Sequence, residues 1–306
     1  MRIAIVGIGG IGGYFGGKLA LHYASHETIQ VIFIARGEHL EKMKEKGLKV
    51  ITVEGEFVAK PAIATDDPKD VGSLDLVIFA VKGYDLEPSA RMVAPNLNPQ
   101  SVVIPLLNGV ASTETLRAVL PQSRILNGCV YISTHRVEPG VVHQVGGPCL
   151  LLFGPEDGGV DAYGGIEKTL KDAGIKAELR SDVKVAVWEK YMFVSPMASV
   201  TSLYRKTLGD MLRDNESRTL FEGLTRELKM VSDAKGIPLP PNIVEISMGK
   251  ASNFPYETKS SMQLDFEKGN KTELDIFTGY VIKASDTLGI EVPLYRMVYE
   301  KLKRTL

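Results

Sequence analysis

Short apolar runs rich in β-branched residues alternate with helical patterns along the first half of the chain. A run of this composition is typical of a strand that is buried on both faces of a parallel sheet. The apolar runs are residues 2–6, 30–35, 74–81, 101–107 and 124–130. The helical patterns between them are residues 7–23, 38–46 and 86–94. This alternation of strand and helix predicts a doubly wound, mainly parallel sheet.

The remaining patterns indicate a hairpin, a β-rich extension and then a helical half. Short alternating pieces at 48–53 and 56–63 predict the hairpin. Residues 131–153 are β-rich, with turn signals at Glu138-Pro139-Gly140 and Gly146-Gly147-Pro148. Long amphipathic patterns follow at residues 183–195, 216–235, 243–251, 274–288 and 294–303. We therefore expect an α/β domain over 1–181 and an all-α domain over 182–306.

Composition excludes several classes of function. The chain has 306 residues, of which 44% are hydrophobic and 24% charged, and its formal net charge is −1. Such a balance supplies no basic field, so we expect neither nucleic acid nor a membrane as a partner. The two cysteines, Cys129 and Cys149, do not have the spacing of metal ligands. We find no apolar stretch as long as the about 18 residues that a membrane span needs. We expect a cytoplasmic protein without a metal.

A glycine-rich turn follows the first predicted strand and opens the first predicted helix. Its residues are Gly7, Ile8, Gly9, Gly10, Ile11 and Gly12, which fit the pattern G-x-G-x-x-G. In this context the first glycine allows a tight turn, the second lets the backbone approach a pyrophosphate, and the third lets the helix pack on the strand. The turn therefore predicts a dinucleotide site, although close packing alone also explains such glycines.

The end of the second predicted strand indicates which dinucleotide binds. A carboxylate there binds the 2′-hydroxyl of NAD, whereas an arginine suits the 2′-phosphate of NADP. This chain has Ala35-Arg36-Gly37, which favours NADP(H). Lys82 follows the 74–81 strand at the same sheet edge and could add a second positive charge. The alternatives to phosphate binding are that Arg36 is a solvated loop residue near Glu38 and that Lys82 is an ordinary surface lysine.

Four further residues are candidates for chemistry. Asn108 ends the apolar run IPLLNG, where its amide could bind a substrate oxygen, although Asn-Gly is also a common turn. Lys190 lies among apolar neighbours on a predicted helix, where burial would lower its pKa toward that of a general acid. The alternative is a snorkelling surface lysine. Ser261 and Glu273 supply a hydroxyl and a carboxylate, and an acid at a helix start is also favoured by the helix dipole.

These motifs occur in one order across nearly the whole chain. They are the glycine turn, ARGEHL, VKGYD, LLNG, WEK, KSSMQLD and TELD. In this combination the chain resembles the ketopantoate reductase (2-dehydropantoate 2-reductase) family. The resemblance implies an N-terminal Rossmann domain and an all-α C-terminal domain of the 6-phosphogluconate dehydrogenase-like type. It also implies NADPH-dependent reduction of the 2-oxo acid ketopantoate to pantoate, a step toward pantothenate and coenzyme A.

The resemblance also assigns roles to individual residues. Lys190 matches the catalytic lysine, and Asn108 matches the asparagine between cofactor and substrate. Ser261 matches the serine that binds the substrate carboxylate, and Glu273 matches the glutamate of the TELD-type motif. Arg36 and Lys82 match the family's residues for the NADP phosphate.

One departure from the family pattern affects the substrate. The family has asparagines four and eight residues after the catalytic lysine, where this chain has Val194 and Ala198. Ser195 and Ser199 come one residue later, and a distortion at Pro196 could turn one of them into the pocket. Reduction of another small 2-oxo acid, or NADPH-responsive binding without catalysis, therefore remains open. A homodimer through the helical domain is a further expectation.

Overall fold

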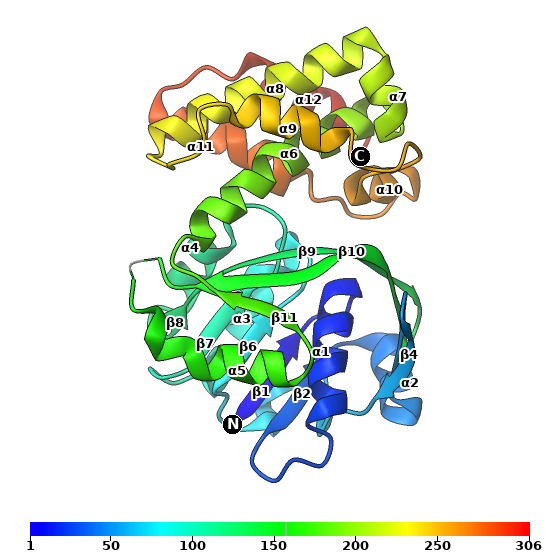
Figure 1. Cartoon of the computed structure of the whole chain (residues 1–306), viewed down its shortest axis with the longest axis vertical. Helices are drawn as coiled ribbons and strands as arrows, with labels where there is room; N and C mark the ends of the chain where they lie inside the picture. The colour runs from blue at the N-terminus through cyan, green and yellow to red at the C-terminus, as the bar shows by residue number, and fades with distance from the viewer. Residues whose placement is uncertain (157) are drawn as a thin grey trace. The chain divides into compact units, whose positions relative to one another are not determined.

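The chain folds into two compact units. The computed structural model describes residues 1–156 and 158–306, apart from the side chain of Asp70. One unit comprises Met1–Leu107 and Ser112–Lys184, and the other comprises Asn108–Ala111 and Val185–Leu306. The first contains the sheets and the second is built from helices, which confirms the predicted fold class (Figure 1).

The main sheet of the first unit has six parallel strands in the order β5-β2-β1-β6-β7-β8. The strands are β1 (Arg2–Val6), β2 (Gln30–Ile34), β5 (Ile63–Thr65), β6 (Leu76–Phe79), β7 (Val102–Pro105) and β8 (Arg124–Ile125). This is the doubly wound dinucleotide-binding order, whose direction reverses between β1 and β6. The carboxyl ends of β1 and β6 lead directly to the glycine turn and to Lys82.

Both faces of this sheet are covered, which explains the unbroken apolar runs. Ile3 and Ile5 of β1 point into one core with Phe15, whereas Ala4 and Val6 point into another with Leu86. The helices of this unit are α1 (Gly10–His22), α2 (Gly37–Lys46), α3 (Leu86–Val93), α4 (Ser112–Val119) and α5 (Gly164–Asp172). We did not predict α4 or α5, which are short and bury few side chains.

A second sheet packs in the same unit in the order β11-β10-β3-β4, with β9 paired to β10. Its strands are β3 (Leu48–Thr52), β4 (Gly55–Ala59), β9 (Asn127–Glu138), β10 (Val141–Gly154) and β11 (Lys176–Leu179). The hairpin of β3 and β4 and the turn at Pro139-Gly140 are confirmed. The predicted strand at 124–130 is wrong as one element, because it divides between β8 and β9.

The second predicted turn, at Gly146-Gly147-Pro148, is also wrong. Strand β10 runs through it, and its register against β9 shifts on both sides of Gly146. Gly147 has a φ of +83° and Cys149 a φ of +54°. The glycines therefore form a bulge inside a long strand rather than its end, because the same residues permit both conformations.

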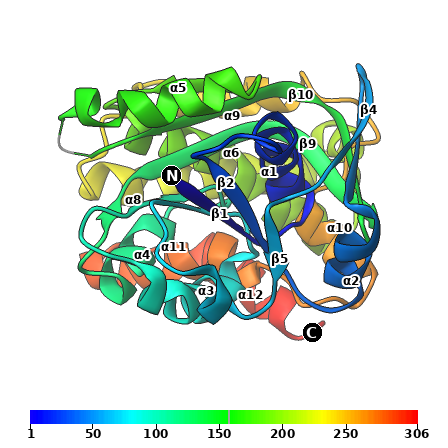
Figure 2. The ribbon, with the colours of Figure 1, turned by 90° about the horizontal axis from the view of Figure 1, so that it is seen from below.

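Helix α1 lies between the two sheets, and glycines set its distance from them (Figure 2). A Cβ on Gly13 would lie 2.6 Å from Val142 of β10, and one on Gly17 would lie 2.8 Å from Val50 of β3. On the other side, a Cβ on Gly16 would lie 3.0 Å from Ile5. Side chains at these positions would force the layers apart. The glycine content of α1 therefore exceeds what a nucleotide motif alone requires.

The second unit is a bundle around one apolar core. Its elements are α6 (Val183–Tyr204), α7 (Leu208–Arg213), α8 (Asn215–Ala234), α9 (Ile243–Ala251), α10 (Ser261–Glu267), the π-helix η5 (Asp275–Gly279), α11 (Tyr280–Leu288) and α12 (Pro293–Lys303). We predicted that the first of these ends at Ser195, but α6 continues past Pro196. Ala198 and Val200 bury that continuation in the core, and packing of this kind overrides the local preference of proline.

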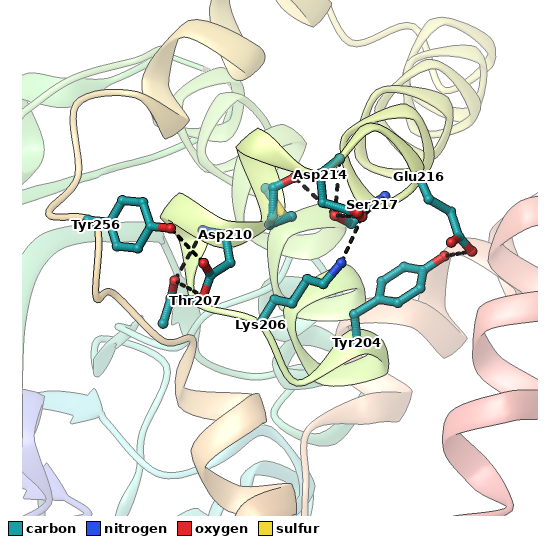
Figure 3. Close-up of polar contacts among 9 residues, drawn as sticks. Tyr204, Lys206, Thr207, Asp210, Asp214, Glu216, Ser217 and Tyr256 are labelled. Carbon is teal, nitrogen blue, oxygen red and sulfur yellow. Dashed lines mark hydrogen bonds and ion pairs between the residues drawn. The ribbon is translucent and has the colours of Figure 1, made fainter.

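Polar side chains determine the sharp connections from α6 to α8 (Figure 3). Thr207 begins α7 by accepting a hydrogen bond from the Asp210 N–H at 3.1 Å. Asp214 begins α8 in the same way, with the Ser217 N–H at 3.0 Å. The Lys206 ammonium lies 2.7 Å from the Asp214 carboxylate and, with the hydrogen bonds from the Ser217 N–H and hydroxyl, holds the pKa of Asp214 well below its usual value. In the part of the chain that is described, no helix has both the length and the apolar character to cross a membrane.

We expect Gly12→Ala to destabilise the α/β unit. The added methyl group would lie 2.0 Å from the Gly7 carbonyl oxygen, which is backbone and cannot rotate away. Urea unfolding should show the free energy of unfolding reduced by about 1–3 kcal/mol, the usual cost of overpacking. Gly9→Ala is the matched control, since beyond Gly9 and its neighbours in the chain no described atom lies within 4 Å of the Cβ position. Equal stability of Gly12→Ala and the wild type would contradict this packing.

Candidate functional site

The glycine turn links β1 to α1 at the carboxyl edge of the main sheet. Gly7 has a φ of +91°, which favours glycine, and its N–H donates to the Ile34 carbonyl at 3.0 Å. A Cβ on Gly7 would also lie 2.6 Å from Val81, which follows β6. The turn is therefore held between the ends of three neighbouring strands, where open α/β sheets bind their ligands.

The start of α1 fits a phosphate group. The N-cap residue of α1 is Gly9, which has no side chain to occupy the helix N–H groups, and the first turn of α1 contains no acidic residue. The first N–H groups of a helix have no partner within the helix and carry a partial positive charge. Since the space beside Gly9 is open, a pyrophosphate can approach these groups. The residues present thus suit a dinucleotide.

Gly10 has a packing role in addition to its place in the motif. A Cβ there would lie 2.7 Å from the Thr134 carbonyl oxygen of β9, and the Thr134 hydroxyl donates to the Gly10 carbonyl at 3.2 Å. The sequence motif alone does not distinguish this contact from a ligand contact. Gly9 and Gly12 show the two roles separately, one with open space and the other against the Gly7 carbonyl.

Arg36 lies at the beginning of α2, directly after β2. Its guanidinium donates to the Asp85 carboxylate at 3.0 Å, and its side chain is 82% exposed. Asp85 ends the 3-10 turn Gly83–Asp85 that Lys82 precedes. The structure therefore brings together the two segments that were predicted to bind a 2′-phosphate. It also shows that the Asp85 carboxylate would compete with a phosphate for the Arg36 guanidinium.

Asn108 and Lys190 are in direct contact within the helical unit. The Lys190 ammonium donates to the Asn108 side-chain carbonyl at 2.8 Å, and the bond is partly buried. Lys190 projects from α6, and Asn108 follows β7 at the start of the short segment 108–111. Gly109, with a φ of +95°, packs so closely that a Cβ would lie 2.7 Å from Ile276. The pair can hold a proton donor beside a carbonyl-binding amide.

Glu273 is buried, and only Leu274 separates it from the π-helix η5. Its backbone carbonyl accepts hydrogen bonds from the Ile276 and Phe277 N–H groups, each at 3.0 Å. A π-helix shifts the hydrogen-bond pattern of the backbone and is frequent at functional sites. Glu273 therefore lies beside an irregular segment that also packs against Gly109.

Hydroxyl groups of α6 hold this segment, and sequence reasoning missed that role. The Tyr191 hydroxyl lies 3.0 Å from the Ile276 carbonyl and 2.6 Å from the Phe277 carbonyl. The Ser195 hydroxyl also donates to the Phe277 carbonyl, at 2.7 Å. Tyr191 directly follows Lys190 in the chain, so the helix that carries the lysine also fixes the segment that begins after Glu273. Hydroxyls at spacing i, i+4 on a buried helix face were the available signal.

The idea that Ser195 or Ser199 replaces the missing asparagines is wrong in this structure. Both side chains are fully buried. Ser195 pairs with Tyr295 as well as Phe277, and Ser199 shares a 2.9 Å hydrogen bond with Thr278. Pro196 does not turn them outward because α6 stays helical through it.

Ser261 begins α10 and is exposed, whereas its neighbour Ser260 is buried. The Ser260 hydroxyl caps the helix at the Gln263 N–H and hydrogen-bonds to Thr201 at 2.8 Å. The two serines of the KSSMQLD motif thus differ in burial and in their hydrogen bonds. Ser260 anchors α10 on α6, whereas Ser261 is on the surface.

Comparison with known proteins gives consistent matches over both units. Residues 3–158 match the family model described as ketopantoate reductase PanE/ApbA, and residues 182–305 match its C-terminal counterpart. The chain is 30% identical to the uncharacterized oxidoreductase YkpB of Bacillus subtilis (strain 168), over 99% of this chain and 98% of the relative.

Two solved structures are similar over the full length. A PanE/ApbA family ketopantoate reductase from Ralstonia eutropha JMP134 has a TM-score of 0.90 and 28% identity, covering 100% of this chain and 98% of the other. A 2-dehydropantoate 2-reductase from Porphyromonas gingivalis W83 has a TM-score of 0.85 and 30% identity, covering 99% of each chain.

We expect Tyr191→Phe to reduce the free energy of unfolding by about 1–3 kcal/mol, because it leaves a carbonyl of η5 without its hydroxyl partner. Tyr256→Phe is the control, since it removes an exposed hydrogen bond, to Asp210 at 2.6 Å, and should change stability by no more than about 0.5 kcal/mol (Figure 3). Chemical denaturation of both variants measures the difference. Similar losses in the two variants would show that the Tyr191 hydroxyl does not hold η5.

Proposed function

Because this chain belongs to the ketopantoate reductase family, we propose that it catalyses the NADPH-dependent reduction of 2-dehydropantoate (ketopantoate) to pantoate. This reaction is a step toward pantothenate and coenzyme A. The observation that carries the proposal is the contact between Lys190 and Asn108, which joins the proton donor that a ketone reduction needs to an amide that can orient the ketone. The 2-dehydropantoate 2-reductase from Porphyromonas gingivalis, 30% identical, supports it.

The α/β domain, residues 1–181, is the proposed site of NADP(H). When bound, the cofactor supplies the hydride that reduces the ketone carbon. The glycine turn, residues 7–12, would hold the pyrophosphate through backbone N–H groups at the open side of Gly9. Arg36 and Lys82 would bind the 2′-phosphate. Asn108 would also accept a hydrogen bond from the carboxamide of the nicotinamide.

The helical domain, residues 182–306, carries the proposed catalytic groups. Lys190 acts as the general acid and gives its proton to the oxygen of the ketone as the alcohol forms. Asn108 orients that oxygen, and Ser261 binds the carboxylate of the substrate. Glu273 positions Lys190 or a hydroxyl group of the substrate from its buried place before η5.

The alternative is an NADP-dependent reductase of another small 2-oxo acid. The observation that favours it is that apolar residues, Val194 and Ala198, stand where the family has asparagines, while the nearby Ser195 and Ser199 hydroxyls are hydrogen-bonded within the core. A site without those polar contacts loses part of its preference for a substrate hydroxyl. The same lysine and amide would serve either acid.

We expect Lys190→Ala to lower kcat by about 10²- to 10⁴-fold, the usual value of general acid catalysis. NADPH affinity, measured by titration calorimetry, should stay close to that of the wild type. Lys229→Ala is the matched control, because that lysine forms an i,i+4 ion pair with Asp233 on α8. Turnover by Lys190→Ala at the rate of the control would refute its role.

Arg36 and Asp85 should control the choice between cofactors in opposite directions. We expect Arg36→Ala to raise the KM for NADPH about tenfold, the loss of about one charge-assisted hydrogen bond, with little change for NADH. Asp85→Asn removes the competing carboxylate and should lower the KM for NADPH. Steady-state kinetics with both cofactors tests this. Equal effects of Arg36→Ala on NADPH and NADH would mean that Arg36 does not bind the phosphate.

A further inference from the structure

A buried histidine on α2 forms a hydrogen bond with the backbone of the glycine turn. His39 is 5% exposed, and its Nε2 lies 2.6 Å from the Ile8 carbonyl oxygen. Its Nδ1 lies 2.8 Å from the backbone nitrogen of Gly140, in the turn between β9 and β10. The imidazole therefore joins three segments that are distant in sequence. Neither the glycine motif nor the proposed mechanism assigns it a task.

The two contacts determine the protonation of the ring. A backbone N–H can only donate, so the Gly140 N–H requires Nδ1 to be the unprotonated acceptor. The proton of the neutral ring then lies on Nε2, which donates to the Ile8 carbonyl. Burial lowers the pKa of the His39 imidazole, and this favours the neutral form that the hydrogen bond from the Gly140 N–H needs.

The bond to Ile8 determines the direction of the next backbone N–H group. In a planar trans peptide, the carbonyl of one residue and the N–H of the next point in opposite directions. When the Ile8 carbonyl points at His39, the Gly9 N–H points away from it. Among the glycines of the turn, Gly9 alone has open space at the position that a Cβ would take.

We propose that His39 is a positioning residue for the cofactor, which orients the Ile8–Gly9 peptide so that the Gly9 N–H faces the pyrophosphate. The hydrogen bond to Gly140 holds the ring from the other side and fixes the tautomer that makes this possible. The Gly140 carbonyl in turn accepts the Lys49 N–H of β3 at 2.9 Å, so the ring is supported by the second sheet. The inference rests on the proposed function only in naming NADP(H) as the ligand.

Two substitutions separate the two hydrogen bonds. In His39→Gln the side-chain nitrogen takes the place of Nε2 and retains the bond to Ile8. In His39→Asn the side-chain oxygen takes the place of Nδ1 and retains the bond from Gly140. Each variant loses one hydrogen bond, so each serves as the stability control for the other.

We expect His39→Asn to weaken NADPH binding about tenfold, and His39→Gln less than about threefold, by titration calorimetry. In assays the loss should appear in the KM for NADPH, with kcat and the KM for the 2-oxo acid unchanged. Amide hydrogen exchange of the cofactor-free protein should be faster at residues 9–13 in His39→Asn than in His39→Gln. Equal affinity and exchange in the two variants, or losses that follow their unfolding free energies, would overturn the proposal.

The wild-type protein provides a test that requires neither substitution nor cofactor. Nitrogen NMR shifts of the His39 ring should show a proton on Nε2 and none on Nδ1. A proton on Nδ1 would overturn the proposal. If the wild type binds no NADPH, the proposed function fails, while the exchange and NMR results still decide whether His39 orients the turn.

Discussion

The close approach of α1 to two sheets is the constraint on which the α/β unit depends. A Cβ on Gly12 would meet the backbone of the glycine turn, and one on Gly13 or Gly17 would meet the second sheet. Because the helix cannot move away from one layer without striking the other, its N-terminus is fixed relative to β1. The open space at Gly9 is thereby held at the sheet edge, where a phosphate can reach the N–H groups of the helix.

In the helical unit the corresponding constraint is that the buried π-helix η5 must keep its carbonyl groups hydrogen-bonded. Two carbonyls of the π-helix η5 accept hydrogen bonds from side chains of α6, the Ile276 carbonyl from Tyr191 and the Phe277 carbonyl from Tyr191 and Ser195. The cost of an unpaired buried carbonyl links the position of η5 to α6. Since Lys190 is the residue before Tyr191, the same packing fixes the helix turn that carries the proposed acid.

Local patterns were sufficient to predict the glycine turn, most of the helices and the main sheet apart from its edge strand β5. They could not show the course of β10, because glycines that form a bulge are the same residues that form a turn. They also placed the end of α6 too early, since the preference of Pro196 is local and the packing that overrides it is not.

In the candidate site, too, local sequence predicted the residue types but not their tertiary contacts. The pair Lys190 and Asn108 was predicted as two separate residues, and only the fold shows that they touch. The hydrogen bonds of the Ser195 and Ser199 hydroxyls and the role of His39 depend on contacts across 31 to 101 residues of sequence, which no local motif records. Residue types indicated the chemistry, whereas tertiary contacts decide which groups are available for it.

The central claim is that the chain reduces 2-dehydropantoate with NADPH. Oxidation of NADPH by the purified wild-type protein, followed with 2-dehydropantoate and with a series of other 2-oxo acids, tests it most directly. We expect kcat/KM to be highest for 2-dehydropantoate and to fall when NADH replaces NADPH. A higher kcat/KM for an acid with a more apolar side chain, or no oxidation of NADPH with any of them, would contradict the claim.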